Sequence, residues 1–213
     1  NVQPQLILPQ FKKIDPLCPP GQCYGYQNVL FSLIEPIMQQ TTGKTYAELM
    51  QEHIFTPLQL PTASVGLDGF FSTENRAMPH VRARGSWHST KVAESYYRFA
   101  PAAGVNASAV DLGYWLVSQL GHNPAVFSDT LLAQITSKRV KTRRDLRRKD
   151  WRRYLTDAHY ALGWRVFDYA GQQVIFHAGA VQGYRGLMAL VPGQDLGVAM
   201  VWNSDSSLPS SSV

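Results

Sequence analysis

The spacing of apolar residues predicts helices in the first two thirds of the chain. Apolar side chains recur with helical period from residue 29 to residue 38, and Gly43 follows them as an expected C-cap. Pro36 lies inside this predicted buried helix and removes a backbone hydrogen bond, so we expect a kink or an early end. Thr45 and Glu48 have the spacing of a capping box, which predicts the start of a second helix.

A long irregular stretch and two further helices are predicted next. Residues 57–105 are rich in Pro, Gly, Ser and Arg and have weak periodicity, which predicts an extended loop region. Ser108 lies three residues before Asp111 and is the expected cap of a helix that stops at Gly121. Another helix is expected from Ser128 through the basic residues that follow it.

The pattern changes to short β-prone runs after Thr156. The runs are YALGWRVFDY, VIFHAGA, GYRGLMALV and LGVAMVWN, with turns at AGQQ and PGQD. They predict about three or four antiparallel strands. Helices first and a strand meander last is an α+β order. We expect one partial domain over residues 1–213, with residues 24–155 mainly helical with long loops, residues 156–203 forming the strands, and residues 204–213 starting a truncated C-terminal helix.

Length and composition fit a folded chain. The 213 residues are 45% hydrophobic and 11% aromatic, which is enough to bury a sizeable core. No run approaches the roughly 18 apolar residues of a membrane-spanning helix, so we expect no membrane span. A strand meander this hydrophobic leaves a face and an edge exposed unless further elements join it, and we therefore expect the chain to be cut at both ends.

Positive charge is concentrated in one segment. The formal net charge is +5, and ten of the twenty Lys and Arg residues lie between Lys138 and Arg153. The segment is compatible with a phosphate-binding arm, but Asp145, Asp150 and its aromatic residues have the spacing of a solvated amphipathic helix. We favour the solvated face and expect no nucleic-acid partner.

Cysteine and histidine usage bears on redox state and metal binding. Cys18 and Cys23 flank a Pro-Pro-Gly turn. Their spacing permits a small disulfide loop in an oxidising compartment, and two free thiols are the alternative. The six histidines form no HxxxH motif or Cys/His cluster, so we expect no metal site and no other cofactor.

Tyr26 and Asn28 are candidate site residues just before the first predicted helix. In an extended or turn backbone, residues i and i+2 project to the same side. A tyrosine can relay a proton to or from a serine, and an asparagine amide can hold a substrate carbonyl, as acyl transfer requires. Such a triplet is common, and a half-buried tyrosine followed by an Asn helix cap is the alternative interpretation.

The second candidate element is His177-Ala178-Gly179, on a strand that begins at Val174. A protonatable side chain on an edge strand, followed by small residues, leaves room for a substrate against the backbone. The N–H of Ala180 can then donate to an oxyanion. A histidine that only satisfies a local hydrogen bond at a strand end is the alternative.

An ordered set of segments between Tyr24 and Asn203 carries a family resemblance. The segments are YGYQNVLFSLIEPIMQQTTGKTYAELMQEHIFTPLQL, PAAGVNASAVDLGYWL, YALGWRV and HAGAVQGYRGLMALVPGQDLGVAMVWN. In this order they resemble the Y-x-N helix segment, the P-x-G-G segment, the YGLGW strand and the HxG strand of one superfamily. The superfamily is that of the class C β-lactamases and penicillin-binding proteins.

The resemblance implies a β-lactamase/transpeptidase-like α+β fold, with an antiparallel sheet packed against a helical region. It also implies an acyl-enzyme serine hydrolase, bacterial and periplasmic or secreted, that acts on an amide, ester or β-lactam bond of a small-molecule or peptide substrate. By motif, Tyr26 matches the proton relay, Asn28 the substrate-carbonyl binder, and His177 and Gly179 the ends of K-T-G. With His177 and Ala178 in place of Lys and Thr, the resemblance is closer to esterase, D-aminopeptidase and peptidase branches.

The nucleophile is the element of the family pattern that the chain lacks. In the family an S-x-x-K motif precedes Y-x-N. No Ser in this chain is followed three residues later by Lys, and the nearest pattern, Thr41 to Lys44, lies after the triplet. We expect the nucleophile to lie before Asn1 and this chain alone to be inactive. A non-catalytic paralogue that binds penicillins or cell-wall peptides is the alternative.

Overall fold

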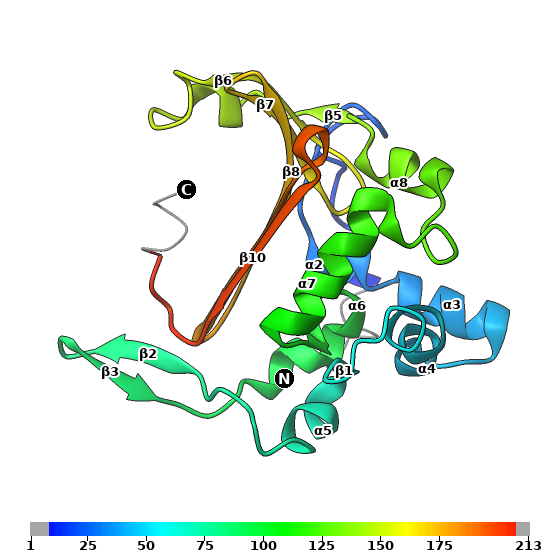
Figure 1. The fold of residues 1–213 in the computed structure, drawn as a ribbon, viewed down its shortest axis with the longest axis vertical. Helices are drawn as coiled ribbons and strands as arrows, with labels where there is room; N and C mark the ends of the chain where they lie inside the picture. Colours follow the sequence, from blue (N-terminus) through cyan, green and yellow to red (C-terminus); the bar gives the residue numbers. More distant parts are fainter. Residues whose placement is uncertain (1–8, 208–213) are drawn as a thin grey trace.

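The computed structural model describes residues 9–207 and contains a six-stranded sheet with helices packed against it (Figure 1). The strand order is β10-β9-β8-β7-β6-β5, and every neighbouring pair is antiparallel. The strands are β5 (Val140–Lys141), β6 (Leu155–Tyr160), β7 (Arg165–Tyr169), β8 (Gln172–Val181), β9 (Tyr184–Val191) and β10 (Leu196–Trp202). The predicted α+β class is confirmed.

Turn residues explain the meander. Ala170 and Gly171 both have positive φ, 50° and 79°, and form the two-residue turn between β7 and β8. Gly163, with φ 80°, divides the predicted run YALGWRVFDY into β6 and β7. The expected number of strands was too small because of this division and because β5, with only two residues, carries no alternating pattern.

The first predicted helix is interrupted. The structure has α2 (Asn28–Phe31) and α3 (Ile34–Thr42), which ends as predicted at Gly43 with φ 72°. Pro36 lies in the first turn of α3. The N–H groups of a first turn have no acceptor within the helix, so the missing N–H of Pro36 removes no hydrogen bond, and the helix begins here instead of kinking. The predicted burial is wrong for the described residues, because no side chain of α3 is buried and Ile37 is 55% exposed.

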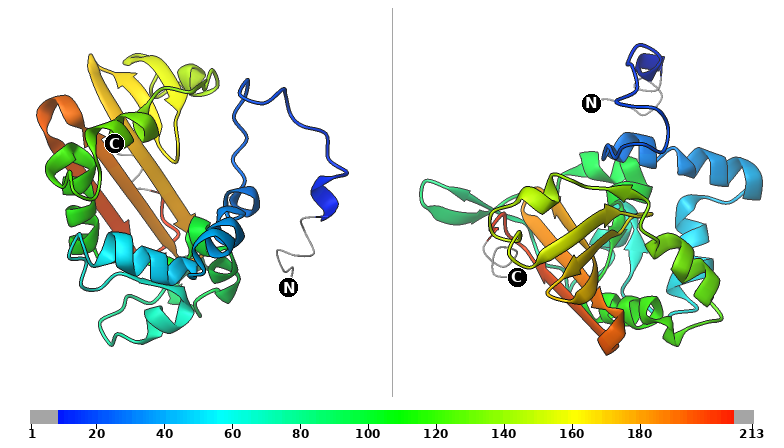
Figure 2. Two further views of the ribbon diagram at one scale, coloured as in Figure 1. Left: turned by 90° about the vertical axis from the view of Figure 1, so that its right-hand side faces the viewer. Right: turned by 90° about the horizontal axis from the view of Figure 1, so that it is seen from above.

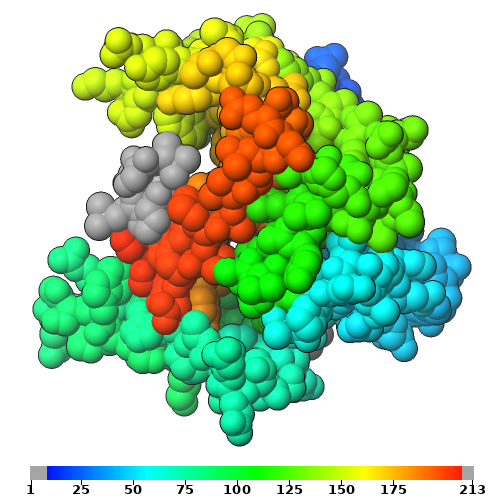
Figure 3. Space-filling model, viewed as in Figure 1, coloured from blue at the N-terminus to red at the C-terminus, as the bar shows by residue number. Residues whose placement is uncertain are grey.

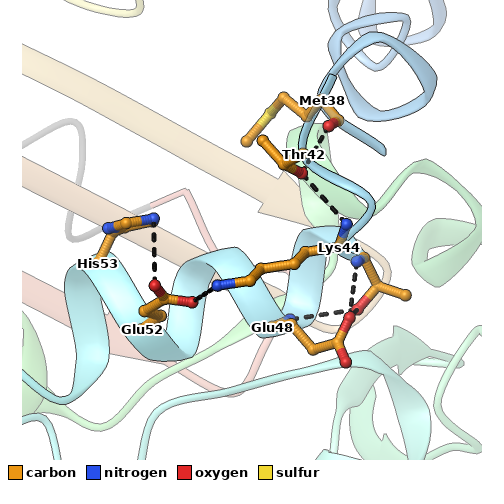
Figure 4. Close-up of polar contacts among 7 residues, drawn as sticks. Met38, Thr42, Lys44, Glu48, Glu52 and His53 are labelled. Atoms are coloured by element: carbon orange, nitrogen blue, oxygen red, sulfur yellow. Dashed lines mark hydrogen bonds and ion pairs between the residues drawn. The ribbon is translucent and has the colours of Figure 1, made fainter. Parts of the chain in front are cut away.

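The α3–α4 connection is held by the predicted capping box and by contacts of Thr42 that the sequence did not predict (Figure 4). The Thr42 hydroxyl donates to the carbonyl of Met38 (2.7 Å) and accepts from the N–H of Lys44 (3.2 Å). Thr45 and Glu48 form the expected capping box of α4 (Tyr46–Met50). A π-helical turn follows (η1, Gln51–Phe55).

The stretch predicted as a long loop contains several short elements. They are β1 (Ser64–Val65), α5 (Gly66–Phe71), β2 (His80–Ala83), β3 (Ser86–Ser89), the 3-10 helix η2 (Glu94–Phe99), α6 (Ala100–Ala103) and β4 (Val105–Asn106). β1 pairs with β4, and β2 and β3 form a hairpin that projects from the body (Figure 1). Elements this short are below what periodicity detects.

The helix α7 (Ala109–Val117) begins at the predicted capping box of Ser108 and Asp111, and the π-helical turn η3 (Ser118–His122) continues it. Gly121 has φ 94° and ends the helical run as expected. Asp111 is 1% exposed and also accepts the N–H of Thr62, which ties α7 to the preceding loop region.

The helix predicted through the basic segment is wrong. α8 (Asp129–Thr136) ends before it, and the segment forms β5, the 3-10 turn η4 (Asp145–Arg147) and further turns. Pairing with β6 and packing of Leu146 and Trp151 against the sheet stabilise this path, whereas a helix would stack like charges at i and i+4.

Two cores lie on opposite faces of the sheet, and a third lies among the helices. Leu116 of α7 packs on one face with Trp164, Val166, Ile175 and Leu190. The other face carries a cluster around Phe167. Trp115 contacts both the sheet core and the helical core, so it joins the two parts.

The ends of the described region add two observations. Residues 204–207 form bends and no helix, and residues 208–213 of the expected C-terminal helix lie outside the described residues. Between residues 9 and 207 no helix is both long and apolar enough to cross a membrane.

Candidate active site

The segment that carries Tyr26 runs in extended form into α2. Gln27 is the N-cap of α2, and its side-chain oxygen accepts the N–H of Val29 at 3.1 Å. Asn28 is the first residue of the helix. The alternative in which Asn28 only caps the helix is therefore wrong, and its carboxamide is left to face the cavity described below.

Two further tyrosines and an arginine fix this segment against the sheet. The ring of Tyr24 stacks on Tyr160 of β6, with centroids 4.0 Å apart and planes at 22°. The guanidinium of Arg165 lies 5.8 Å from the Tyr24 ring and 5.7 Å from the Tyr160 ring, and it pairs with Asp145 at 3.1 Å. Burial raises the pKa of both tyrosines, so their phenols stay protonated at neutral pH.

His177 is held as a neutral imidazole. Its Nδ1 lies 2.5 Å from the carbonyl oxygen of Gly163, so Nδ1 carries the proton and donates to that carbonyl. Burial lowers the pKa of His177 and outweighs the hydrogen bond to Gly163, which raises it, and the charge of Arg165 lowers it further. Its Nε2 is therefore an available proton or hydrogen-bond acceptor at pH 7.

The backbone of β8 beyond His177 has a free edge. β8 is an inner strand of the sheet and not the edge strand expected, but β7 begins at Arg165 opposite Phe176, whereas β8 continues to Val181. A two-residue turn joins β8 to β9, so the residues that flank the turn form a hydrogen-bonded pair. Because such pairs alternate, Ala178 and Ala180 direct their N–H groups to the edge that β7 leaves uncovered.

One cavity of about 1050 Å³ between the sheet and the helical part contains all five predicted residues. Among the residues that line it are Tyr26, Asn28, His177, Gly179 and Ala180. The ring centroids of Tyr26 and His177 lie 6.3 Å apart. A phenol, a carboxamide, a neutral imidazole and a backbone donor therefore face a common space.

The sequence did not single out Tyr24, Tyr160 or Arg165, which also line the cavity. Tyr24 lies two residues before Tyr26, and the i, i+2 alternation is a signal that could have found it. The contact of Tyr160 and Arg165 with Tyr24 depends on long-range pairing, which leaves no trace in local sequence. Across residues 9–207, no three His, Cys, Asp or Glu side chains cluster as a metal site.

The family model for the beta-lactamase family matches residues 2–212 of this chain. The chain belongs to the beta-lactamase family. Among curated proteins, this beta-lactamase family member is 28% identical over 193 residues to a D-aminopeptidase of Gluconobacter oxydans. It is 24% identical over 199 residues to an unguisins hydrolase of Aspergillus campestris.

Solved structures of the family show the same fold. A penicillin-binding protein homologue from Pyrococcus abyssi, described as octameric, superposes with a TM-score of 0.81 at 18% identity and covers 95% of this chain. A class C beta-lactamase from Rhodobacter sphaeroides superposes with a TM-score of 0.69 at 18% identity and covers 96% of this chain. The predicted β-lactamase/transpeptidase-like fold is confirmed.

The matched proteins are longer than this chain. The chain spans about a third of the curated relatives, 33% of the D-aminopeptidase and 35% of the unguisins hydrolase. It spans 44% of the Pyrococcus structure and 62% of the Rhodobacter beta-lactamase.

Proposed function

We propose that this beta-lactamase family chain forms part of a serine hydrolase that cleaves an amide, ester or β-lactam bond through an acyl-enzyme. The observation that carries the proposal is the shared cavity of Tyr26, Asn28, His177 and the Ala180 N–H. Acyl transfer needs a proton relay, a carbonyl-binding group and an oxyanion donor, and these groups supply one of each.

In the proposed reaction a serine hydroxyl attacks the substrate carbonyl and the carbonyl electron pair moves onto oxygen. The N–H of Ala180 donates to that oxyanion from the free edge of β8. Tyr26 relays the serine proton to the leaving amine or alcohol, and the Asn28 carboxamide donates to a substrate carbonyl. Gly179 has no side chain, so the substrate backbone can lie against the strand. Water then hydrolyses the acyl-enzyme by the reverse sequence of proton transfers.

His177 acts in this proposal as a neutral hydrogen-bond acceptor beside Tyr26. The carbonyl of Gly163 accepts the Nδ1 proton and so fixes the ring orientation and the tautomer. Burial favours the neutral ring, in which Nε2 is unprotonated and can accept a proton or a hydrogen bond. Arg165, behind the Tyr24 ring, holds the segment that presents Tyr26 in place.

The nucleophile is proposed to lie on a polypeptide segment before residue 1. Two observations support this. No Ser-x-x-Lys occurs in the sequence, and the curated relatives are about three times as long as the matched region. The cavity is also lined by apolar residues, among them Ile54, Phe55, Trp115 and Met188, which the proposed segment would help to cover.

The proposed substrate is a small amide or a peptide. The D-aminopeptidase relative and the structural similarity to D-amino acid amidase of Ochrobactrum anthropi, with a TM-score of 0.73 at 18% identity, point in this direction. His177 in place of lysine favours these branches over dedicated β-lactamases. No cofactor and no nucleic-acid partner are part of the proposal.

The proposed location is an oxidising compartment, the bacterial periplasm or the outside of the cell. Cys18 and Cys23 form a disulfide, and disulfides persist chiefly in such compartments.

Replacement of the Tyr26 hydroxyl tests the proposal. In the longer protein, Tyr26→Phe should lower kcat roughly 10²–10⁴-fold, because a positioned proton relay is typically worth that much. Tyr114→Phe is the matched control, since Tyr114 is similarly exposed (49% against 56%) but lies outside the cavity. Equal kcat values for the two variants would contradict the role of Tyr26.

A further inference from the structure

A covalent loop directly precedes the segment that presents Tyr26. Cys18 and Cys23 form a disulfide across the Pro-Pro-Gly turn, and the N–H of Gln22 donates to the carbonyl of Pro19 (3.1 Å) inside the loop. Only two residues separate Cys23 from Tyr26. Figure 2 shows that the first part of the described chain loops outward, away from the sheet and the helices, before it returns to α2.

Few other contacts hold the Tyr26 segment. Within the described residues, the backbone of residues 23–26 forms no hydrogen bond, so neither a strand nor a helix fixes it. Tyr26 itself is 56% exposed. The fixed points are the Tyr24 stack on Tyr160, the start of α2 and the disulfide.

The two arms of the loop are packed against each other. A Cβ placed on Gly25 would lie 2.9 Å from Cδ1 of Leu17, so these positions, just outside the two cysteines, are in close contact. Leu17 is 85% exposed and has little other packing to hold it there. The disulfide is therefore the bond that keeps the two arms together.

We propose that the Cys18–Cys23 disulfide is a positioning element of the active site: together with the stack of Tyr24 on Tyr160 it restricts the backbone of residues 23–26 and so holds the phenol of Tyr26 relative to His177. This inference rests on the proposed function for its catalytic consequence. The disulfide touches no substrate in this account and acts only through Tyr26. A misplacement of a catalytic group by about 1 Å can cost roughly 10²-fold in rate, so a mobile segment would impair the relay without removing it.

The kinetic test is a double-mutant cycle in the longer protein. Replacing both cysteines (C18S/C23S) should lower kcat roughly 10- to 100-fold and leave KM within about threefold, because the substrate-binding groups stay in place. In the Tyr26→Phe background the same replacement should cost less than about threefold, since the group it positions is already absent. Gln22→Ala, which keeps the disulfide, is the matched control and should retain the parent rate.

Two kinetic outcomes overturn the inference. One is an equal loss in the parent and in the Tyr26→Phe background, which would mean that the disulfide acts on the fold as a whole. The other is no loss in either background. Removal of the disulfide also relaxes a constraint on the unfolded chain and lowers the free energy of unfolding in both backgrounds alike. The double-mutant cycle cancels that shared loss, so only the positioning effect differs between the backgrounds.

A measurement on the 213-residue chain separates this inference from the proposed function. Backbone ¹⁵N order parameters of residues 24–26 should be about 0.85 in the parent and in Gln22→Ala, and should fall below about 0.6 in C18S/C23S. Should the longer protein prove inactive, the proposed function fails, while these order parameters still decide the positioning role. Unchanged order parameters in C18S/C23S overturn it.

Discussion

His177 shows how burial changes the chemistry that a residue type suggests. The resemblance placed it where the family has a lysine, which is a permanent cation at neutral pH. In the structure burial and the charge of Arg165 lower its pKa, and the carbonyl of Gly163 orients it. The residue at this position is therefore a neutral acceptor, a difference that sequence could not show because Gly163 and Arg165 reach it through strand pairing.

The lowered pKa of His177 predicts a pH-dependent stability. Its pKa in the unfolded chain is near the ordinary value of 6.5, and in the folded chain it is lower. The unfolded state therefore binds more protons as pH falls below about 6.5, and stability falls with pH over that window. The free energy of unfolding should drop between pH 7.5 and pH 5.5 by more in the parent than in His177→Gln.

His88→Gln is the control for this experiment. His88 lies exposed on the projecting hairpin, so its replacement should leave the parent's pH dependence intact. Urea unfolding at the two pH values provides the measurement. If His177→Gln loses as much stability as the parent on acidification, His177 is not held neutral by its surroundings.

Among the elements, those with local signals were predictable. The capping boxes at Thr45 and Ser108 and the left-handed glycines at Gly43 and Gly121 are present in the structure, because each depends on neighbouring residues alone. The predicted helix through the basic segment was wrong, since a two-residue pairing with β6 decides its path.

The capping box of α7 makes a measurable contribution to stability. Ser108→Ala removes the acceptor of the Asp111 N–H (3.2 Å) and one donor to the buried Asp111 carboxylate. The loss should be about 1 kcal/mol, the typical value for an N-cap serine. Ser86→Ala, at an exposed position of β3, should change stability by less than about 0.5 kcal/mol. Equal urea midpoints for the two variants would show that the cap does not stabilise α7.

At the scale of the whole molecule, an ordered set of sequence motifs predicted the fold class and the five site residues that line one cavity. The motifs did not predict the other residues of the cavity wall. Tyr24, Tyr160 and Arg165 come together only when β6 and β7 pair and the first segment folds onto them. The apolar faces of α3 and β10 carry exposed side chains, such as Ile37 and Val198. Periodicity predicted the first helix to be buried, which was wrong for α3, because the pattern identifies an apolar face but not whether another element covers it.

The positive charge of the molecule is concentrated in one surface region. The basic segment 138–153 lies at the surface, on the edge of the sheet opposite β10 (Figures 1 and 3). Part of its charge is compensated, because Lys138 pairs with Asp157 and Asp168 and Lys141 pairs with Asp157. These contacts interrupt the continuous cationic stripe that phosphate tracking requires.

We expect no tight DNA complex from this segment. Filter binding at about 50 mM and about 200 mM salt is the measurement, and only weak association is expected at the lower salt. A tight, sequence-independent complex whose affinity falls roughly 10³-fold or more between the two would show that the segment is a phosphate-binding arm.

The most direct test of the account is covalent labelling. The 213-residue chain and the longer protein are each incubated with a fluorescent penicillin or an activated ester and analysed by intact mass spectrometry and peptide mapping. We expect an adduct on a serine before residue 1 of the longer protein and no adduct on the 213-residue chain, whose cavity orients a substrate but offers no activated nucleophile. Stoichiometric labelling of the 213-residue chain, or no labelling of the longer protein, would contradict it.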